Sequence, residues 1–138
     1  MSLSNPIGIH SLGHALPKDV VANQHFVDIG LQTTPEWIES RTGIQNRHIE
    51  TTNPTSDLAA AAARHAIDQS SITIDQIDFI IVATASPDHH GFPATACIVQ
   101  QKLGCQRPIP CFDITAACSG FAYGLTLAYA KIKAGLAT

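Results

Sequence analysis

The sequence predicts an α/β protein in which helices cover both faces of a mostly parallel sheet. Segments with the composition of strands alternate along the chain with segments that carry helix start and stop signals. Residues 77–84 (IDFIIVAT) form a nearly continuous apolar run rich in β-branched side chains, which is typical of a strand buried on both faces. Buried strands that alternate with helices indicate a parallel sheet in an α/β architecture.

The N-terminal part begins with two weaker signals. Residues 7–12 (IGIHSL) alternate loosely between apolar and small or polar side chains, and we expect an opening strand there. Asn23 belongs to a residue type that caps helices, so a short helix is expected to follow it and to end at Gly30.

A stronger helix signal follows at Thr34 and Pro35. Threonine is a favoured N-cap, and proline suits the first helical position because the backbone N–H that it lacks would have no partner there. Gly43 is the expected end of this helix. Trp37 and Arg41 lie four residues apart within it, so their side chains share one face.

The central part of the chain is expected to hold two more helices and a strand. Residues 57–67 are rich in alanine, the strongest helix former, and permit close packing against a sheet. A helix is also expected over residues 94–103, because Pro93 precedes it and Gly104 follows it as a C-cap. Residues 109–114 then indicate a short strand.

Residues 116–133 form a helical pattern that is apolar on all sides, and such a helix is expected in a core. Cys118 is therefore expected at or near the N-terminus of a buried helix, directly after a strand. The helix dipole and the unpaired amides there favour an anion, which lowers the pKa of a thiol and yields the nucleophilic thiolate. The alternative is that Cys118 is simply a small buried apolar residue, as free cysteines often are.

Composition argues against several classes of function. The 138 residues suffice for one domain or part of one, and a net charge of −3 without blocks of like charge argues against a nucleic-acid partner. No segment approaches the ~20 apolar residues of a membrane span, and the N-terminus lacks a secretory signal pattern. The four cysteines form no C-x-x-C pair, so we expect reduced thiols and a cytoplasmic location. We expect no metal, including at Asp88, His89 and His90, because closed sites need three or four converging ligands.

Residues 113–121 (DITAACSGF) resemble the nucleophile region of the β-ketoacyl-acyl-carrier-protein synthase III family, within the thiolase-like superfamily. That family carries its acyl-accepting cysteine in a D-x-x-x-A-C-[AS]-G-F pattern, and Cys118 occupies the cysteine position. Further blocks match in chain order: EWI at 36–38, RTGI at 41–44, RHI at 47–49, IIVAT at 80–84 and FPATAC at 92–97. Several separated blocks in the right order are far more specific than one motif.

The resemblance implies a thiolase-like fold, in which two related α/β halves pack as five αβαβα layers. Residues 1–138 would then form an N-terminal half-domain that is incomplete at its C-terminal end, and the second half would be absent. The family's catalytic histidine and asparagine belong to that second half. None of the seven histidines of this chain matches the catalytic histidine.

The resemblance also implies a two-stage acyl transfer. Cys118 would take the acyl group of an acyl-coenzyme A, and malonyl-acyl-carrier protein would lose carbon dioxide and condense with it, which starts fatty acid synthesis. The implied protein is a homodimer that needs no cofactor, acyl-CoA being a substrate. Two alternatives stay open: a related synthase III-like enzyme of polyketide or quinolone biosynthesis, and a non-catalytic binding or assembly module if 138 residues are the full chain.

Four further site residues follow from the resemblance. Trp37 and Arg41, and more weakly Thr33, match residues that contact coenzyme A, since an indole offers a stacking face and a guanidinium fits phosphate oxygens. By residue type alone, Trp37 could equally pack in a core and Arg41 could form a surface ion pair. Phe92 matches a residue at the dimer interface that lines the partner's acyl pocket. A hydrophobic staple before a helix is the alternative for Phe92.

Overall fold

The computed structural model describes residues 6–138, which fall into two compact units. The larger unit contains the chain up to Ala15 and all residues from Pro54 onward, and the smaller unit is Leu16–Asn53. Each unit has its own two-stranded sheet, antiparallel in the smaller unit and parallel in the larger.

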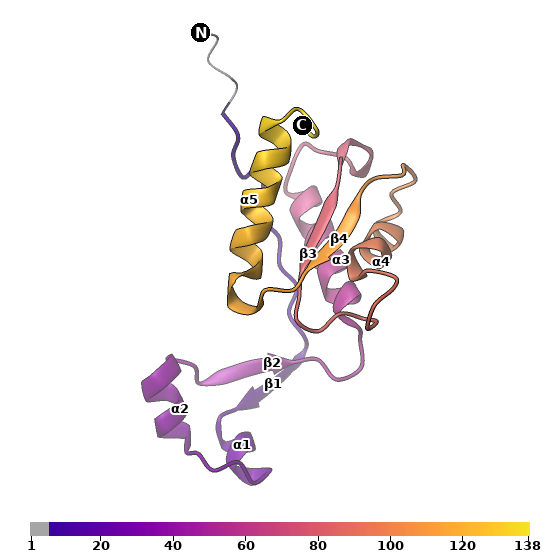
Figure 1. The fold of residues 1–138 in the computed structure, drawn as a ribbon. Coiled ribbons are helices and arrows are strands. Elements are labelled where there is room, and N and C mark those ends of the chain that lie inside the picture. The colour runs from indigo at the N-terminus through magenta and orange to yellow at the C-terminus, as the bar shows by residue number, and fades with distance from the viewer. Residues whose placement is uncertain (1–5) are drawn as a thin grey trace. The chain divides into compact units, whose positions relative to one another are not determined.

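The smaller unit is a β-ribbon with two helices in the connection between its strands (Figure 1). Strand β1 (Asp19–Ala22) pairs antiparallel with β2 (Asn46–Ile49). Helices α1 (Gln24–Asp28) and α2 (Pro35–Thr42) lie between them in sequence. The parallel sheet expected from the sequence is therefore confined to the larger unit.

Helix α2 confirms the signal at its two ends. The Thr34 hydroxyl oxygen accepts a hydrogen bond from the Trp37 amide at 3.1 Å, and Pro35 is the first helical residue. Gly43 ends the helix in the left-handed conformation with φ 70°, which glycine adopts without the steric cost of a Cβ.

Asn23 has a different role from the one expected of it. Helix α1 begins directly after it, but its side chain makes no cap hydrogen bond and is instead buried. The Asn23 amide donates to the Ile44 carbonyl at 2.7 Å, and its oxygen accepts from Arg47 at 2.8 Å. The side chain thus joins the two strand ends of the ribbon rather than the turn of helix α1.

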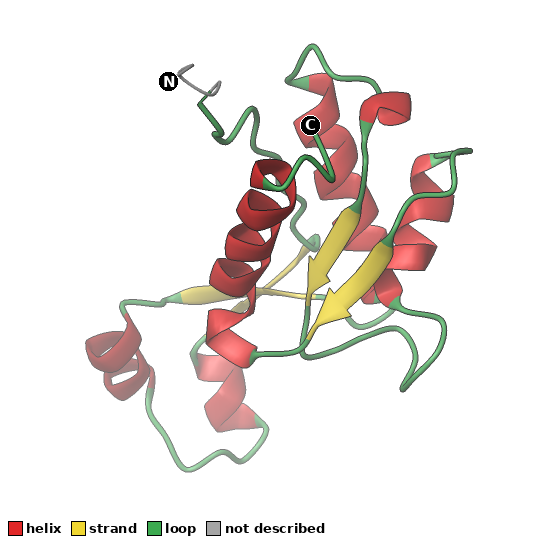
Figure 2. Ribbon diagram, turned by 45° about the horizontal axis from the view of Figure 1, so that its top comes forward, coloured by secondary structure: helices red, strands yellow, loops and turns green. Residues whose placement is uncertain are grey.

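The larger unit is a two-stranded parallel sheet with helices on both faces (Figures 1 and 2). Strands β3 (Ile80–Ala83) and β4 (Cys111–Ile114) pair with Ile80 opposite Cys111. Helices α3 (Thr55–Asp68) and α4 (Thr95–Leu103) cover one face, and α5 (Gly120–Lys133) covers the other. Two short 3₁₀ turns, Ile74–Gln76 and Ala117–Ser119, complete the elements.

The core of this unit lies between α3, α4 and one face of β3. Ala60 of α3 and Val99 and Leu103 of α4 are its buried residues, and Ile80 and Val82 of β3 pack against them. Ile80 and Val82 alternate with Ile81 and Ala83, so the latter face α5 on the opposite side of the sheet. Small alanines on α3 allow its axis to approach α4 and the strands closely.

Three expectations about strands and burial are wrong. Residues 6–17 contain no strand, since the loose alternation of 7–12 is local whereas a strand needs a neighbouring backbone to bond with. Strand β3 is shorter than 77–84, and its side chains are half-buried to exposed. Helix α5 is not buried on all sides: only Gly120 is buried, and Phe121 is 66 % exposed. Neighbours cover only one side of α5, and burial requires neighbours.

The contact of Gly13 with α3 gives a first prediction. A Cβ on Gly13 would overlap the Ala62 carbonyl oxygen and the Ala66 amide nitrogen, both backbone atoms that cannot rotate away. Gly13→Ala should therefore lower the free energy of unfolding by about 3 kcal/mol, measured by urea denaturation. Gly8→Ala is the matched control, because a Cβ there would meet nothing within 4 Å. Equal unfolding midpoints for the two variants would contradict this packing.

Candidate functional site

Cys118 lies in the turn that connects strand β4 with helix α5. The strand ends at Ile114, Cys118 is the middle residue of the 3₁₀ turn Ala117–Ser119, and α5 begins at Gly120. Cys118 was expected directly after a strand, and it does follow the carboxyl end of a parallel strand. This is the end of the sheet at which α/β proteins bind ligands. Cys118 is exposed, so the alternative that it is simply a small buried apolar residue is wrong.

The residue before Cys118 has a strained backbone. Ala117 has φ 43°, and it is the one non-glycine residue with positive φ among residues 6–138. A Cβ in this region costs roughly 1–2 kcal/mol, and such strain clusters at functional sites. The surrounding turn is held by backbone bonds from Thr84 N–H to the Ile114 carbonyl and from Ser119 N–H to the Ala116 carbonyl, 3.1 and 3.0 Å long.

Two glycines let α5 lie close to the strands immediately after Cys118. A Cβ on Gly120 would stand 3.4 Å from the Cβ of Ala83, and a Cβ on Gly124 would stand 3.7 Å from Ile81. Gly120 is buried, although the cysteine turn before it is exposed. The first turns of α5 are thus seated on the ends of the sheet, which fixes where the cysteine turn emerges.

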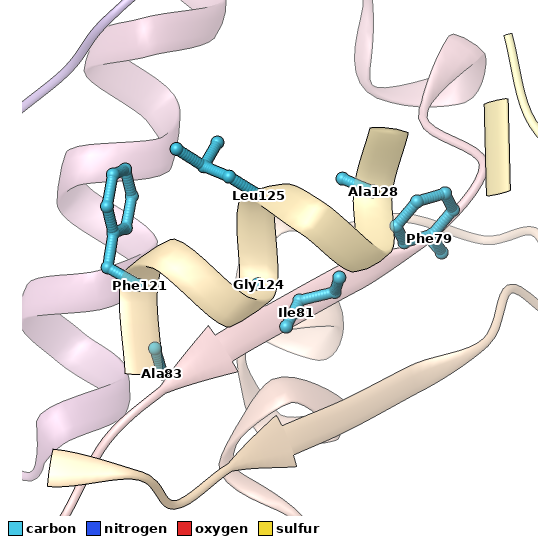
Figure 3. A pocket seen from close by; sticks show the side chains of 7 residues that line it. All are labelled: Phe79, Ile81, Ala83, Phe121, Gly124, Leu125 and Ala128. Atoms are coloured by element: carbon cyan, nitrogen blue, oxygen red, sulfur yellow. The ribbon is translucent and has the colours of Figure 1, made fainter. Parts of the chain in front are cut away.

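An apolar pocket of about 260 Å³ lies beside this turn, between β3 and α5. Figure 3 shows Phe121 and Leu125 projecting from one side of α5, with Ile81 and Phe79 along the strand beneath. Phe121 is only three residues after Cys118. The full lining consists of Phe79, Ile81, Ala83, Phe121, Gly124, Leu125 and Ala128.

Thr33 and Trp37 come together in the smaller unit. With Gln32 and Thr34 they line an open pocket of about 410 Å³. Trp37 is 56 % exposed, so the core alternative for its indole is wrong. The Thr33 hydroxyl is buried and has no hydrogen-bond partner among residues 6–138. Arg41, one turn further along α2, is exposed and makes no ion pair within the same residues.

Phe92 lies in the loop between β3 and α4, in the same unit as Cys118. Its side chain is 96 % exposed, so the hydrophobic-staple alternative, which requires packing on the following helix, is wrong. The loop follows the carboxyl end of β3, and the cysteine turn follows the carboxyl end of β4, its parallel neighbour. Phe92 and Cys118 therefore belong to the same edge of the sheet.

Asp113 is a functional candidate to which sequence reasoning assigned no role. Its two carboxylate oxygens accept hydrogen bonds from the amides of Thr95 at 2.7 Å and Ala96 at 2.8 Å, the first residues of α4. The available signal was Ala94, which stands at the N-cap position and has no side-chain acceptor. A helix start without a capping residue requires an acceptor from elsewhere in the chain.

Two of the three remaining cysteines are less exposed than Cys118. Cys105 is buried, Cys111 is half-buried and Cys97 is exposed. Burial, reinforced by the neighbouring Cys97, raises the pKa of the Cys111 thiol. Within residues 6–138, no group of three or more His, Cys, Asp or Glu side chains could hold a metal ion. The helices in that range are also all too short or too polar to cross a membrane.

Comparison with known proteins shows which proteins this chain resembles. Residues 112–138 match the family model of 3-oxoacyl-[acyl-carrier-protein (ACP)] synthase III. The β-ketoacyl-[acyl-carrier-protein] synthase III of Neisseria meningitidis is 51 % identical over 94 % of this chain and 40 % of its own length. That of Clostridium acetobutylicum is 46 % identical over 95 % of this chain and 39 % of its own. The crystal structure of 3-oxoacyl-[acyl-carrier-protein] synthase III from Aquifex aeolicus superposes with a TM-score of 0.85 at 40 % identity, over 92 % of this chain and 40 % of that one.

The fold and the strand–cysteine–helix arrangement define a thiolase-like protein. Within this class, the chain is similar to the N-terminal part of the β-ketoacyl-[acyl-carrier-protein] synthase III proteins that it matches. It spans about two fifths of the length of the curated relatives that it matches. The resemblance seen in the sequence and the incomplete thiolase-like fold are both confirmed.

The surroundings of the cysteines predict an order of reactivity. Iodoacetamide at neutral pH should alkylate Cys118 well before Cys105 and Cys111, because Cys118 is exposed and burial raises the pKa of Cys111, which reduces its thiolate fraction. Peptide mass mapping over time measures the order, and exposed Cys97 is the internal control for accessibility. Modification of Cys111 as early as Cys118 would contradict the structure.

The strain at Ala117 predicts that replacing this residue with glycine stabilises the protein, whereas a change to glycine usually destabilises one. Ala117→Gly should raise the free energy of unfolding by about 0.5 kcal/mol, because relief of the Cβ clash exceeds the entropy cost of glycine. Ala134→Gly is the matched control: Ala134 has φ −81°, so the same change should lower stability by about 0.5–1 kcal/mol. Urea denaturation measures both, and a loss of stability at both positions would show that the turn at Ala117 is not strained.

Proposed function

We propose that this chain carries the nucleophile of an acyltransferase that starts fatty acid synthesis. Cys118 accepts the acyl group of an acyl-CoA primer, and malonyl-acyl-carrier protein condenses with it in a decarboxylating Claisen reaction. The observation that carries the proposal is the exposed thiol of Cys118 between a parallel strand and a helix, inside the segment that the synthase III family model matches. The relatives from Neisseria meningitidis and Clostridium acetobutylicum are both β-ketoacyl-[acyl-carrier-protein] synthases III, which favours fatty acid synthesis over polyketide or quinolone pathways.

The proposed reaction has two steps. In the first, the Cys118 sulfur bonds to the acyl carbon, the carbon–sulfur bond to coenzyme A breaks, and the thiol proton passes through solvent to the departing coenzyme A sulfur. In the second, the malonyl thioester loses carbon dioxide, and the electron pair left on carbon attacks the acyl carbon and releases the Cys118 sulfur. Splitting the condensation in this way replaces one difficult step by two easier ones. No residue of this chain is assigned to the decarboxylation.

The coenzyme A site is proposed at the Trp37 pocket. Three side chains that could contact a ligand support it. They are the exposed indole of Trp37, the exposed guanidinium of Arg41 and the hydroxyl of Thr33, which has no hydrogen-bond partner within residues 6–138. An indole face stacks on an adenine, and a guanidinium donates two parallel hydrogen bonds to phosphate oxygens. A buried hydroxyl without a partner is costly, and a ligand atom would satisfy it.

A homodimer is proposed around Phe92. A side chain that is 96 % exposed gains about 1.5–3 kcal/mol when a partner surface covers it. In a second copy of the protein, Phe92 would line the acyl pocket across the interface. The remaining proposals follow from the same family resemblance. We expect a cytoplasmic enzyme that needs no cofactor and has neither nucleic acid nor a membrane as a partner. Residues 1–138 would form one thiolase-like half-domain.

Intact-mass spectrometry of the protein with acetyl-CoA tests the proposal. We expect one acetyl adduct on the wild-type protein and none on Cys118→Ala. Cys97→Ala is the matched control, because it removes the other exposed thiol and should keep the adduct. An adduct that persists in Cys118→Ala would overturn the assignment of the nucleophile. Absence of an adduct on the wild-type protein would favour a binding or assembly module instead.

A further inference from the structure

Three of the four cysteines gather where helix α4 packs on strand β4. Cys97 is the third residue of α4, and its thiol donates to the Cys111 carbonyl at 3.8 Å. Cys111 is the first residue of β4, and its thiol donates to the side-chain oxygen of Gln100 at 3.3 Å. Cys105 follows α4 and donates to the Arg107 carbonyl at 3.7 Å, which also accepts from the Gln100 amide at 2.7 Å.

Cys97 and Cys111 face each other across this contact. Cys111 is paired with Ile80, which packs on the core beside α4, so the Cys111 side chain lies on the α4 side of the sheet. Cys97 lies three residues before Gln100, which Cys111 contacts, and residues three apart share a helix face. A disulfide requires two side chains that point toward each other from Cα atoms within about 7 Å. The Cys97 sulfur already contacts the backbone of Cys111.

The two thiols differ in their access to solvent. Cys97 is exposed, so a small oxidant reaches its sulfur directly, whereas Cys111 is half-buried. Burial, reinforced by the neighbouring Cys97, raises the pKa of the Cys111 thiol, which makes Cys111 the poorer first target. Redox-sensitive pairs combine an accessible cysteine, which the oxidant attacks, with a neighbouring cysteine that resolves the oxidised sulfur.

The other two cysteines are poorer partners for Cys97. Cys105 is buried, and its thiol is bound to the Arg107 carbonyl. Cys118 follows the opposite end of β4, and the strand from Cys111 to Ile114 alone spans about 10 Å. Cys118 therefore lies beyond the reach of a thiol that sits beside Cys111.

We propose that Cys97 and Cys111 are a modification site that forms a reversible disulfide on reaction with hydrogen peroxide. The Cys97 thiolate attacks one peroxide oxygen and the O–O bond breaks. Cys97 becomes a sulfenic acid, and the departing hydroxide takes up the proton that the thiol lost. The Cys111 sulfur then bonds to the Cys97 sulfur, the S–O bond breaks, and the second hydroxide leaves as water with the Cys111 proton.

The two thiols together lose two electrons, which reduce one peroxide to two molecules of water. A small thiol restores both cysteines by thiol–disulfide exchange. Transient, redox-sensing disulfides of this kind are the ones found in reducing compartments. Cys118 takes no part in either step, so the pair does not depend on the proposed acyl transfer.

Thiol labelling after peroxide treatment tests the proposal. The protein is treated with a small excess of hydrogen peroxide, unfolded in urea and labelled with N-ethylmaleimide, and mass spectrometry of its peptides locates the labels. We expect Cys97 and Cys111 to lose their labels together and to appear in one linked peptide species. Dithiothreitol should restore both labels.

Variants separate the roles of the two sulfurs. In Cys111→Ser the sulfenic acid of Cys97 has no resolving thiol, so dimedone should trap it and no link should form. Cys97→Ser changes an exposed side chain and should leave Cys111 labelled, which serves if the Cys111 variant does not fold. Cys105→Ser is the matched control, because it removes the third thiol of the cluster and should keep the link.

Three results would overturn the proposal. The first is a link from Cys97 to Cys105, or between two copies of the chain at doubled mass. The second is a dimedone adduct of Cys97 that accumulates in the wild-type protein as much as in Cys111→Ser, because Cys111 would then resolve nothing. The third is full labelling of both Cys97 and Cys111 after the peroxide treatment.

Discussion

The hydrogen bonds of the Asp113 carboxylate are the interaction on which the larger unit depends. They provide the cap that α4 lacks in its own sequence, and they bind that helix to strand β4. Through the Thr95 hydroxyl and Asp88 the same network reaches the start of α3. Two helix ends and one strand end are therefore held by partly buried hydrogen bonds. Hydrogen bonds require a specific direction, whereas the apolar contacts of the small alanine-rich core do not.

The cysteine turn is positioned by packing on its other side. Glycines at the start of α5 bring the helix onto the strands, and the strained Ala117 turns the chain so that Cys118 emerges exposed. The strain persists because the neighbouring backbone bonds determine the turn. The exposure of the candidate nucleophile next to an apolar pocket thus results from two constraints. Helix α5 packs closely on the strands, and a residue in the left-handed conformation precedes the thiol.

The sequence predicted helix ends correctly where they depend only on adjacent residues. Thr34, Pro35 and Gly43 delimit α2 as expected, and Gly104 ends α4 in the left-handed conformation. Two signals that depend on distant residues failed. Residues 7–12 pair with no strand in the described range 6–138. The Asn23 side chain binds Ile44 and Arg47, more than twenty residues away, instead of the adjacent helix. The role of Asp113 could not be seen because its partners are 17 and 18 residues distant.

The sequence by itself determined the class of fold, the resemblance to the synthase III family and the identity of the candidate nucleophile, since these depend on residue types in a fixed order. It also determined that Trp37 and Arg41 share a helix face, because helical periodicity is a local property. Only the tertiary structure decided which side chains are exposed. Cys118, Trp37 and Phe92 could each have been core residues by composition, and all three are exposed. Exposure depends on which surfaces neighbouring elements cover, and no local pattern of residues contains that information.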